Sequence, residues 1–265
     1  METGPLFLMP FSKKNIQDQE LSIQIFKDGF SFCTSNTRSF FNFNNLRIEQ
    51  GDNFQRLLES HSFLGYKKIK GIHFNTSATF VPSSLYSPVQ KETYLHYNVA
   101  LEERWSIVEN QTQDDQIKIL YAVDGQIEAT LKHYFKGISF THYAQILYDL
   151  SSSLTNLEDS VVMNIHMLDD QFDVLVFKDE QLLLYNTYPY KNEPGFLYFV
   201  LAVAEELSLP PEAYTIVFFG KFSRYKKYYT ALANYHEKIK FSDQNELVTF
   251  DEKEHPAPYF LNLYQ

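Results

Sequence analysis

Three aspartates and a histidine gather around one predicted turn in the second half of the chain. The segment 166–173 reads HMLDDQFD, which brings His166, Asp169, Asp170 and Asp173 close together in the sequence. Carboxylate oxygens are the ligands that Mg²⁺ prefers, so this group could hold such an ion beside a nucleotide. In a strand, Asp169 and Asp173 would face one side and Asp170 the other. Acidic turns are common, and we favour a solvated turn over a metal site.

A second chemical candidate is the basic, tyrosine-rich segment KFSRYKKYY, which begins at Lys221. Such a segment could contact phosphate or nucleic acid, and Lys221 could reach an adenylate. The chain has 23 basic and 33 acidic residues and a formal net charge of −10. On so acidic a protein, a positively charged start of a helix needs no ligand, and it could equally dock an acidic partner.

Several common chemistries are excluded by the absence of their motifs. The sequence has no nucleophile elbow, Walker A loop or dinucleotide fingerprint, and its eight histidines show no metal-ligand spacing. The single cysteine, Cys33, rules out a disulfide within the chain. The net charge disfavours nucleic acid as a partner. The longest apolar run, 196–204, is too short to span a membrane, so we expect a cytoplasmic protein without a transmembrane segment.

The composition combines many aromatic residues with few glycines. Phe, Tyr and Trp make up 17% of the chain, whereas glycine occurs only 9 times. Ordinary usage would give about 19 glycines. This scarcity argues against glycine-rich phosphate loops, which need backbone amides to approach the phosphate closely. The aromatic excess could fill a core or form an interface, and we expect Tyr188, Tyr190 and Tyr225 to contact a protein partner.

Alternating apolar residues predict a hairpin near the start of the chain. The stretches 21–26 and 30–35 alternate with period two, and Asp28-Gly29 between them suits a tight turn. Asp124 is predicted to cap a helix that Gly137 closes. Helices are predicted over 52–64, 89–101, 125–135, 144–154, 192–208 and 223–237. Strands are predicted over 38–44, 67–75, 77–82, 106–113, 116–123, 138–144, 160–168, 172–178, 181–187, 213–220, 238–242 and 246–250.

The order of elements repeats after the polar segment 155–159. Both halves read strand, acidic turn, strand, turn, strand, helix, strand. The sequence therefore predicts an α/β protein of two similar domains, 1–155 and 156–265. The helix over 192–208 is apolar nearly all round, so we expect it to lie between the domains.

This order resembles the duplicated, ribonuclease H-like core of the actin-like ATPase superfamily, which actin, Hsp70 and sugar kinases share. The segment 117–150 is similar to the small inserted subdomain of the bacterial branch that contains the cell-division actin homologue and the platform proteins of type IV pili. The resemblance therefore implies an inserted subdomain at about 114–150. With FKDGFSF at 26–32, FVPSSLY at 80–86 and an aromatic-rich end, the chain also resembles an uncharacterised bacterial family with an actin-like fold.

The resemblance implies where a nucleotide site would lie. In the superfamily, the turn of each hairpin wraps a phosphate, and a glycine pair after a later strand receives the adenosine. The corresponding residues here are Asp28 and Gly29 in the first turn, Asp169 and Asp170 in the second, and Gly220 and Lys221 in the adenosine motif.

Each of these motifs departs from the pattern of the superfamily. Phe30 follows Gly29 where a small residue is usual, and we expect its ring to crowd the phosphate. The second turn has no glycine and three carboxylates, which would repel a triphosphate unless a metal intervened. Lys221 stands where a second glycine is usual. The implied nucleotide site is therefore expected to be vestigial.

These departures favour a catalytically degenerate protein over an enzyme. We expect a protein-binding or scaffold module with no catalytic residues, no metal and no cofactor, whose partner is a protein. One alternative is an active kinase or ATPase that uses Asp28 and Asp169 around Mg²⁺ and Lys221 near ATP. A second alternative is a small-molecule sensor that uses the cleft between the domains.

Overall fold

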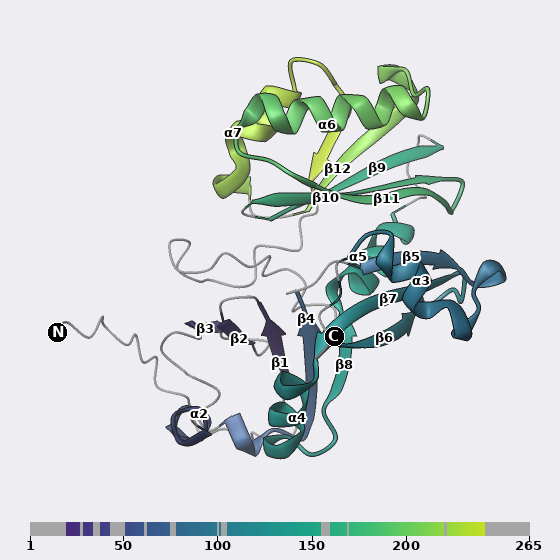
Figure 1. The fold of residues 1–265 in the computed structure, drawn as a ribbon. Coiled ribbons are helices and arrows are strands. Elements are labelled where there is room, and N and C mark those ends of the chain that lie inside the picture. Colours follow the sequence, from purple (N-terminus) through teal and green to yellow (C-terminus); the bar gives the residue numbers. More distant parts are fainter. Residues whose placement is uncertain are drawn as a thin grey trace.

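The described residues form two five-stranded mixed sheets and one three-stranded sheet, with helices packed against them (Figure 1). The computed structural model describes residues 20–26, 29–33, 38–42, 51–60, 63–74, 78–99, 101, 105–154, 160–168, 170–219 and 222–241. This is the α/β architecture that the alternation of strand and helix patterns predicts.

The first sheet has the strand order β3-β2-β1-β4-β8. Its strands are β1 (Glu20–Ile25), β2 (Gly29–Cys33), β3 (Arg38–Asn42), β4 (Lys68–His73) and β8 (Ser139–His142). The first three strands are antiparallel neighbours, whereas β4 and β8 run parallel to β1. One face is covered by α2 (Gly51–Ser60), η2 (Phe63–Gly65) and α4 (Gly125–Tyr134), which bury phenylalanine and leucine side chains against it.

The second sheet repeats this topology in the order β11-β10-β9-β12-β13. Its strands are β9 (Val161–Met167), β10 (Gln171–Lys178), β11 (Gln181–Pro189), β12 (Tyr214–Phe219) and β13 (Ile239–Phe241). Again the first three are antiparallel and the last two run parallel to the first. The predicted duplication is therefore present in the strand order. The strand predicted over 246–250 lies outside the described residues.

The inserted subdomain lies earlier in the chain than we expected. It is a three-stranded sheet in the order β5-β7-β6, placed between β4 and α4. Its elements are β5 (Ala78–Pro82), η3 (Ser83–Leu85), η4 (Pro88–Gln90), α3 (Lys91–His96), β6 (Trp105–Gln111) and β7 (Ile117–Asp124). The prediction of 114–150 was wrong because β8 returns to the first sheet, where Ser139 pairs with Lys70 of β4.

The helix between the two large sheets is α5 (Tyr143–Ser152), which packs against the second sheet through residues such as Tyr143, Leu147 and Tyr148. The helix that we expected there, α6 (Glu193–Glu206), lies with α7 (Phe222–Leu232) on the outer face of the second sheet (Figure 1). A run of apolar residues shows that a helix is buried but not which face of a sheet it covers.

The ends of the helices agree with their sequence signals. The Asp124 carboxylate accepts a hydrogen bond from the Gln126 amide at the start of α4, as predicted. Gly137 follows this helix with φ of +85°, a left-handed conformation that glycine adopts without strain. His142 caps α5 by accepting from the Ala144 amide through Nδ1.

A glycine in β4 provides a test of the close packing beneath α4. A Cβ atom added to Gly71 would lie 2.5 Å from Cδ1 of Phe140, so the ring would have to move. We expect Gly71→Ala to lower the free energy of unfolding by about 1–3 kcal/mol, measured by urea denaturation. The matched control is Gly125→Ala at the start of α4, where no atom lies within 4 Å of the added Cβ. The control should be neutral or slightly stabilising, and equal losses in both variants would contradict the packing argument.

Candidate functional site

Three consecutive parallel strands of the first sheet are each followed at once by an aromatic residue. Phe26 follows β1, Phe74 follows β4 and Tyr143 follows β8. The Phe26 and Phe74 rings stack with centroids 5.0 Å apart, and the Phe74 and Tyr143 rings stack at 4.7 Å with an interplanar angle of 5°. The carboxyl ends of parallel strands are where α/β proteins usually bind ligands. In this protein an aromatic stack, which we define as these three rings, covers that edge of the first sheet.

The aromatic stack continues into a buried polar cluster on the second sheet. Asp173 of β10 accepts hydrogen bonds from the Tyr143 hydroxyl at 3.0 Å and the Thr187 hydroxyl at 2.6 Å, both through Oδ1. Its Oδ2 lies 2.8 Å from Nδ1 of His166, and both of these side chains are fully buried. This cluster ties α5 to the strands β9, β10 and β11.

The tyrosines of this cluster are hydrogen-bond donors. Complete burial raises the pKa of Tyr143 well above its ordinary value, and the nearby Asp173 carboxylate raises it further. Burial also raises the pKa of Tyr185, on the neighbouring strand. Both hydroxyls therefore stay protonated at neutral pH, so neither side chain can serve there as a general base.

The structure describes only part of the predicted nucleotide site. Asp28, Asp169, Gly220 and Lys221 lie outside the described residues. Gly29 begins β2, and its carbonyl accepts a hydrogen bond from the Phe26 amide at 2.9 Å, which closes the first turn. Asp170 is exposed in the second turn, and its carbonyl accepts from the Tyr190 amide at 3.0 Å. Gly29 therefore closes the first turn and Asp170 lies in the second.

The expectation that Phe30 crowds the first turn was wrong. Its side chain faces the helix-covered side of the first sheet, where it packs against Phe54 of α2 with centroids 5.5 Å apart. Neighbouring residues of a strand alternate in direction, so the side chain that follows a turn glycine can point away from the turn. Phe26 and Phe74 were not predicted as site residues, because their only sequence signal is a position at the ends of the predicted strands 21–26 and 67–75.

Two of the three tyrosines expected at a partner surface are buried. Tyr190 and Tyr225 belong to the core beneath α6 and α7, and Tyr190 meets Phe172 edge to face at 5.8 Å. Tyr188 is partly buried and stacks on Phe199 at 4.8 Å. These rings hold the β10–β11 hairpin to its helices. The expectation of a partner surface is therefore not met at Tyr190 and Tyr225 in this conformation.

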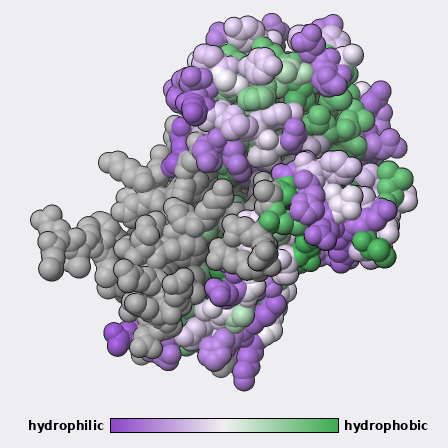
Figure 2. Space-filling model, in the orientation of Figure 1, coloured by the Kyte–Doolittle hydropathy of each residue, from purple (hydrophilic) through white to green (hydrophobic). Residues whose placement is uncertain are grey.

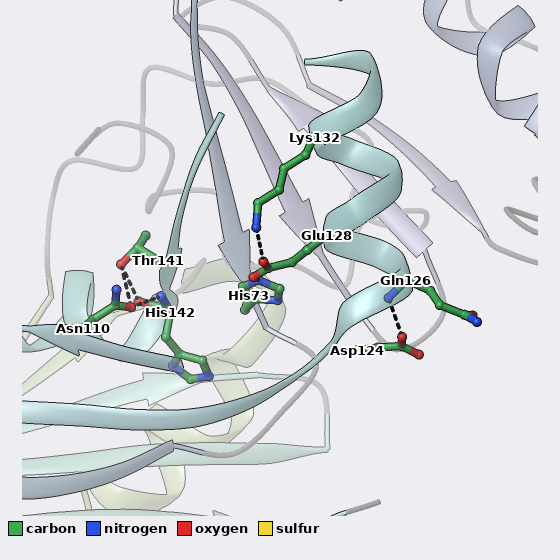
Figure 3. A network of polar contacts seen from close by, with 8 residues as sticks. All are labelled: His73, Asn110, Asp124, Gln126, Glu128, Lys132, Thr141 and His142. Carbon is green, nitrogen blue, oxygen red and sulfur yellow. Dashed lines mark hydrogen bonds and ion pairs between the residues drawn. The ribbon is translucent and has the colours of Figure 1, made fainter. Parts of the chain in front are cut away.

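A second polar network links the first sheet to α4 (Figure 3). Oε1 of Glu128, on α4, lies within hydrogen-bond distance of Nε2 of buried His73, at 3.3 Å. Its Oε2 forms an ion pair with Nζ of Lys132 at 2.7 Å. The hydrogen bond from His73 is the largest cause that lowers the pKa of Glu128, and Lys132 lowers it further. Figure 3 also shows Asn110 of β6 between Thr141 and His142, where it accepts from the His142 amide at 2.9 Å.

The described residues show neither a metal-binding cluster nor a membrane-spanning helix. They contain no group of three or more histidine, cysteine, aspartate or glutamate side chains that could hold a metal ion. Within the same part of the chain, no helix is long and apolar enough to cross a membrane.

The chain has an actin-like ATPase fold. A crystal structure from Bacteroides thetaiotaomicron, of a protein with actin-like ATPase fold and unknown function, matches with a TM-score of 0.73 at 19% identity, over 85% of this chain and 91% of that one. The chain belongs to the family described as protein of unknown function (DUF3822), which matches residues 9–239. No curated protein matches it significantly.

Two other solved structures are similar over most of their length but at lower scores. The type IV pilus biogenesis complex PilM–PilN matches with a TM-score of 0.47 at 10% identity, over 92% of this chain and 94% of that one. The ethanolamine utilization protein EutJ from Carboxydothermus hydrogenoformans matches with a TM-score of 0.46 at 6% identity, over 93% of this chain and 90% of that one. The statement about the fold therefore rests on the Bacteroides structure.

The buried cluster predicts that Asp173 stabilises the junction of α5 with the second sheet. Asp173→Asn replaces an acceptor by an amide donor that would face the hydroxyl and imidazole donors around it. We expect the free energy of unfolding to fall by about 2–3 kcal/mol in chemical denaturation. The control is Asp170→Asn at an exposed position, where a change within about 0.5 kcal/mol is expected. A neutral Asp173→Asn variant would contradict the structural role of the cluster.

The network around Glu128 predicts a loss of stability in acid. Because the pKa of Glu128 is lowered in the folded state, its contribution is present at neutral pH and is lost as the pH falls below the ordinary value of 4.5 and through the folded pKa. We expect Glu128→Gln to destabilise the protein by about 1–2 kcal/mol at neutral pH. That difference from the wild type should shrink in acid, as measured by urea unfolding across the pH range. A difference that does not change with pH would show that the carboxylate charge has no role.

Proposed function

We propose that this protein is a catalytically degenerate member of the actin-like ATPase fold that works as a protein-binding or scaffold module without phosphoryl transfer. The observation that carries this proposal is the aromatic stack of Phe26, Phe74 and Tyr143. It covers the strand ends of the first sheet beside the first hairpin turn. Phosphate binding depends on backbone amides that a phosphate can approach closely, and bulky side chains oppose this approach.

The engagement of Asp173 supports the same conclusion. A carboxylate that coordinates Mg²⁺ must have oxygen lone pairs directed at the ion. Both oxygens of Asp173 already accept hydrogen bonds inside the protein, and the side chain is fully buried. Its charge thus contributes to the packing of α5 rather than to the binding of a metal.

Exposed apolar side chains on the inserted sheet support a protein as the partner. Leu85 of η3 is 70% exposed and Val89 of η4 is 94% exposed. Figure 2 shows hydrophobic surface on the side of the molecule where the inserted sheet lies, next to strongly hydrophilic residues. Exposed apolar side chains next to polar ones are a common feature of protein-binding surfaces.

Titration with Mg-ATP tests the proposal directly. We expect isothermal titration calorimetry to detect no binding at micromolar concentrations and a phosphate-release assay to detect no hydrolysis above the buffer rate. Micromolar affinity together with turnover would overturn the proposal. In that case Asp169→Asn should abolish hydrolysis if this residue works beside Mg²⁺, and Lys68→Gln, an exposed cation of β4, would serve as the control.

A further inference from the structure

A cavity of about 360 Å³ opens beside α5. It lies where the first sheet, the inserted sheet and α5 meet. Lys70 of β4 and Thr141 of β8 form one wall, Asn110 and Gln113 from the end of β6 and the turn after it form another, and Asp149 of α5 lines a third. The volume lies at the lower end of the range of about 300–1,000 Å³ that is typical of small-molecule sites.

The polar wall of this cavity is held in place by its own hydrogen bonds. The Thr141 hydroxyl donates to Oε1 of Gln145 at 2.6 Å, and Nε2 of Gln145 donates to the carbonyl of Gln111 at 2.9 Å. Asn110 accepts from the His142 amide, as Figure 3 shows. These contacts join β6, β8 and α5. The wall is therefore arranged before any ligand arrives, which reduces the entropy lost on binding.

Two opposite charges line the same cavity without an ion pair. Asp149 accepts a hydrogen bond from the Gln113 amide at 3.0 Å, and burial raises its pKa to about 6, with the nearby Asp114 carboxylate adding to the effect. Within the described residues, neither Asp149 nor Lys70 forms an ion pair. A partly buried carboxylate without a cation is costly, and a ligand that brings an ammonium group would offset this cost.

The remaining lining is apolar on one side. Ile146 and Leu150 lie four residues apart on α5, so their side chains share one face of the helix, and both line the cavity. A lysine, an aspartate and two aliphatic side chains in one cavity are complementary to a small zwitterion with an apolar side chain.

We propose that this cavity binds a free α-amino acid with an aliphatic side chain. Its ammonium group would pair with Asp149, its carboxylate with Lys70, and its side chain would contact Ile146 and Leu150. This inference goes beyond the proposed scaffold function. It adds a ligand that would join three parts of the fold and so change how the inserted sheet sits against α5.

Calorimetric titration of the full chain with L-leucine and L-valine tests the assignment. We expect saturable binding by the wild-type protein. N-acetyl-leucine lacks the ammonium group and leucinamide lacks the carboxylate, so each should bind at least about tenfold more weakly, as the loss of one charge pair in a partly buried site implies. If neither amino acid binds at millimolar concentration, the proposal is overturned.

Two variants assign the charged groups. Asp149→Asn keeps an acceptor for the Gln113 amide and should fold, but it should bind leucine about tenfold more weakly and no longer discriminate against N-acetyl-leucine. Lys70→Gln should lose discrimination against leucinamide in the same way. The matched controls are Asp115→Asn on the neighbouring turn and Lys68→Gln on the same strand, neither of which lines the cavity. Unchanged affinity for leucine in both cavity variants, or an equal loss of that affinity in the control variants, would overturn the proposal.

Circular dichroism melting curves establish that each variant is folded.

Discussion

The carboxylate of Asp173 lies at the point where the two halves of the molecule meet. It accepts hydrogen bonds from α5, which belongs to the first half in chain order, and from two strands of the second sheet. A buried charge is stable only where several donors surround it, so the positions of Tyr143, His166 and Thr187 are fixed together. Tyr143 is also the last ring of the aromatic stack. Its hydrogen bond to Asp173 therefore helps to fix the stack over the carboxyl ends of the parallel strands of the first sheet.

The aromatic excess and the scarcity of glycine have a structural counterpart at this edge. Phe26 and Phe74 stand directly after parallel strands, where a ligand-binding α/β protein usually has small residues and exposed backbone amides. Their rings gain dispersion and hydrophobic energy from one another, whereas a phosphate loop leaves its amides open for a ligand. This aromatic edge is the main support for the proposed scaffold function.

Local patterns were sufficient for most elements and for their duplication. The hairpins, the cap at Asp124 and the order of strands follow from periodicity and turn chemistry, which act over a few residues. The boundaries of the inserted sheet could not be predicted, because they depend on the pairing of β8 with β4, far apart in the sequence. Burial of Tyr190 and the position of α6 are also tertiary properties. The candidate cavity could not be predicted either, because Lys70, Gln113 and Asp149 lie far apart in the sequence and meet only in the folded chain.

The two large sheets share a topology but differ in the chemistry of the faces that border α5. On the second sheet, Val162, Asn164 and His166 lie on the same side of β9, the side that faces α5, and all three are buried. Both side-chain polar atoms of Asn164 lack a hydrogen-bond partner among the described residues. Burying such groups costs free energy, and apolar residues would make a more stable scaffold. This buried polar face supports the proposal that the protein is a catalytically degenerate member of its fold.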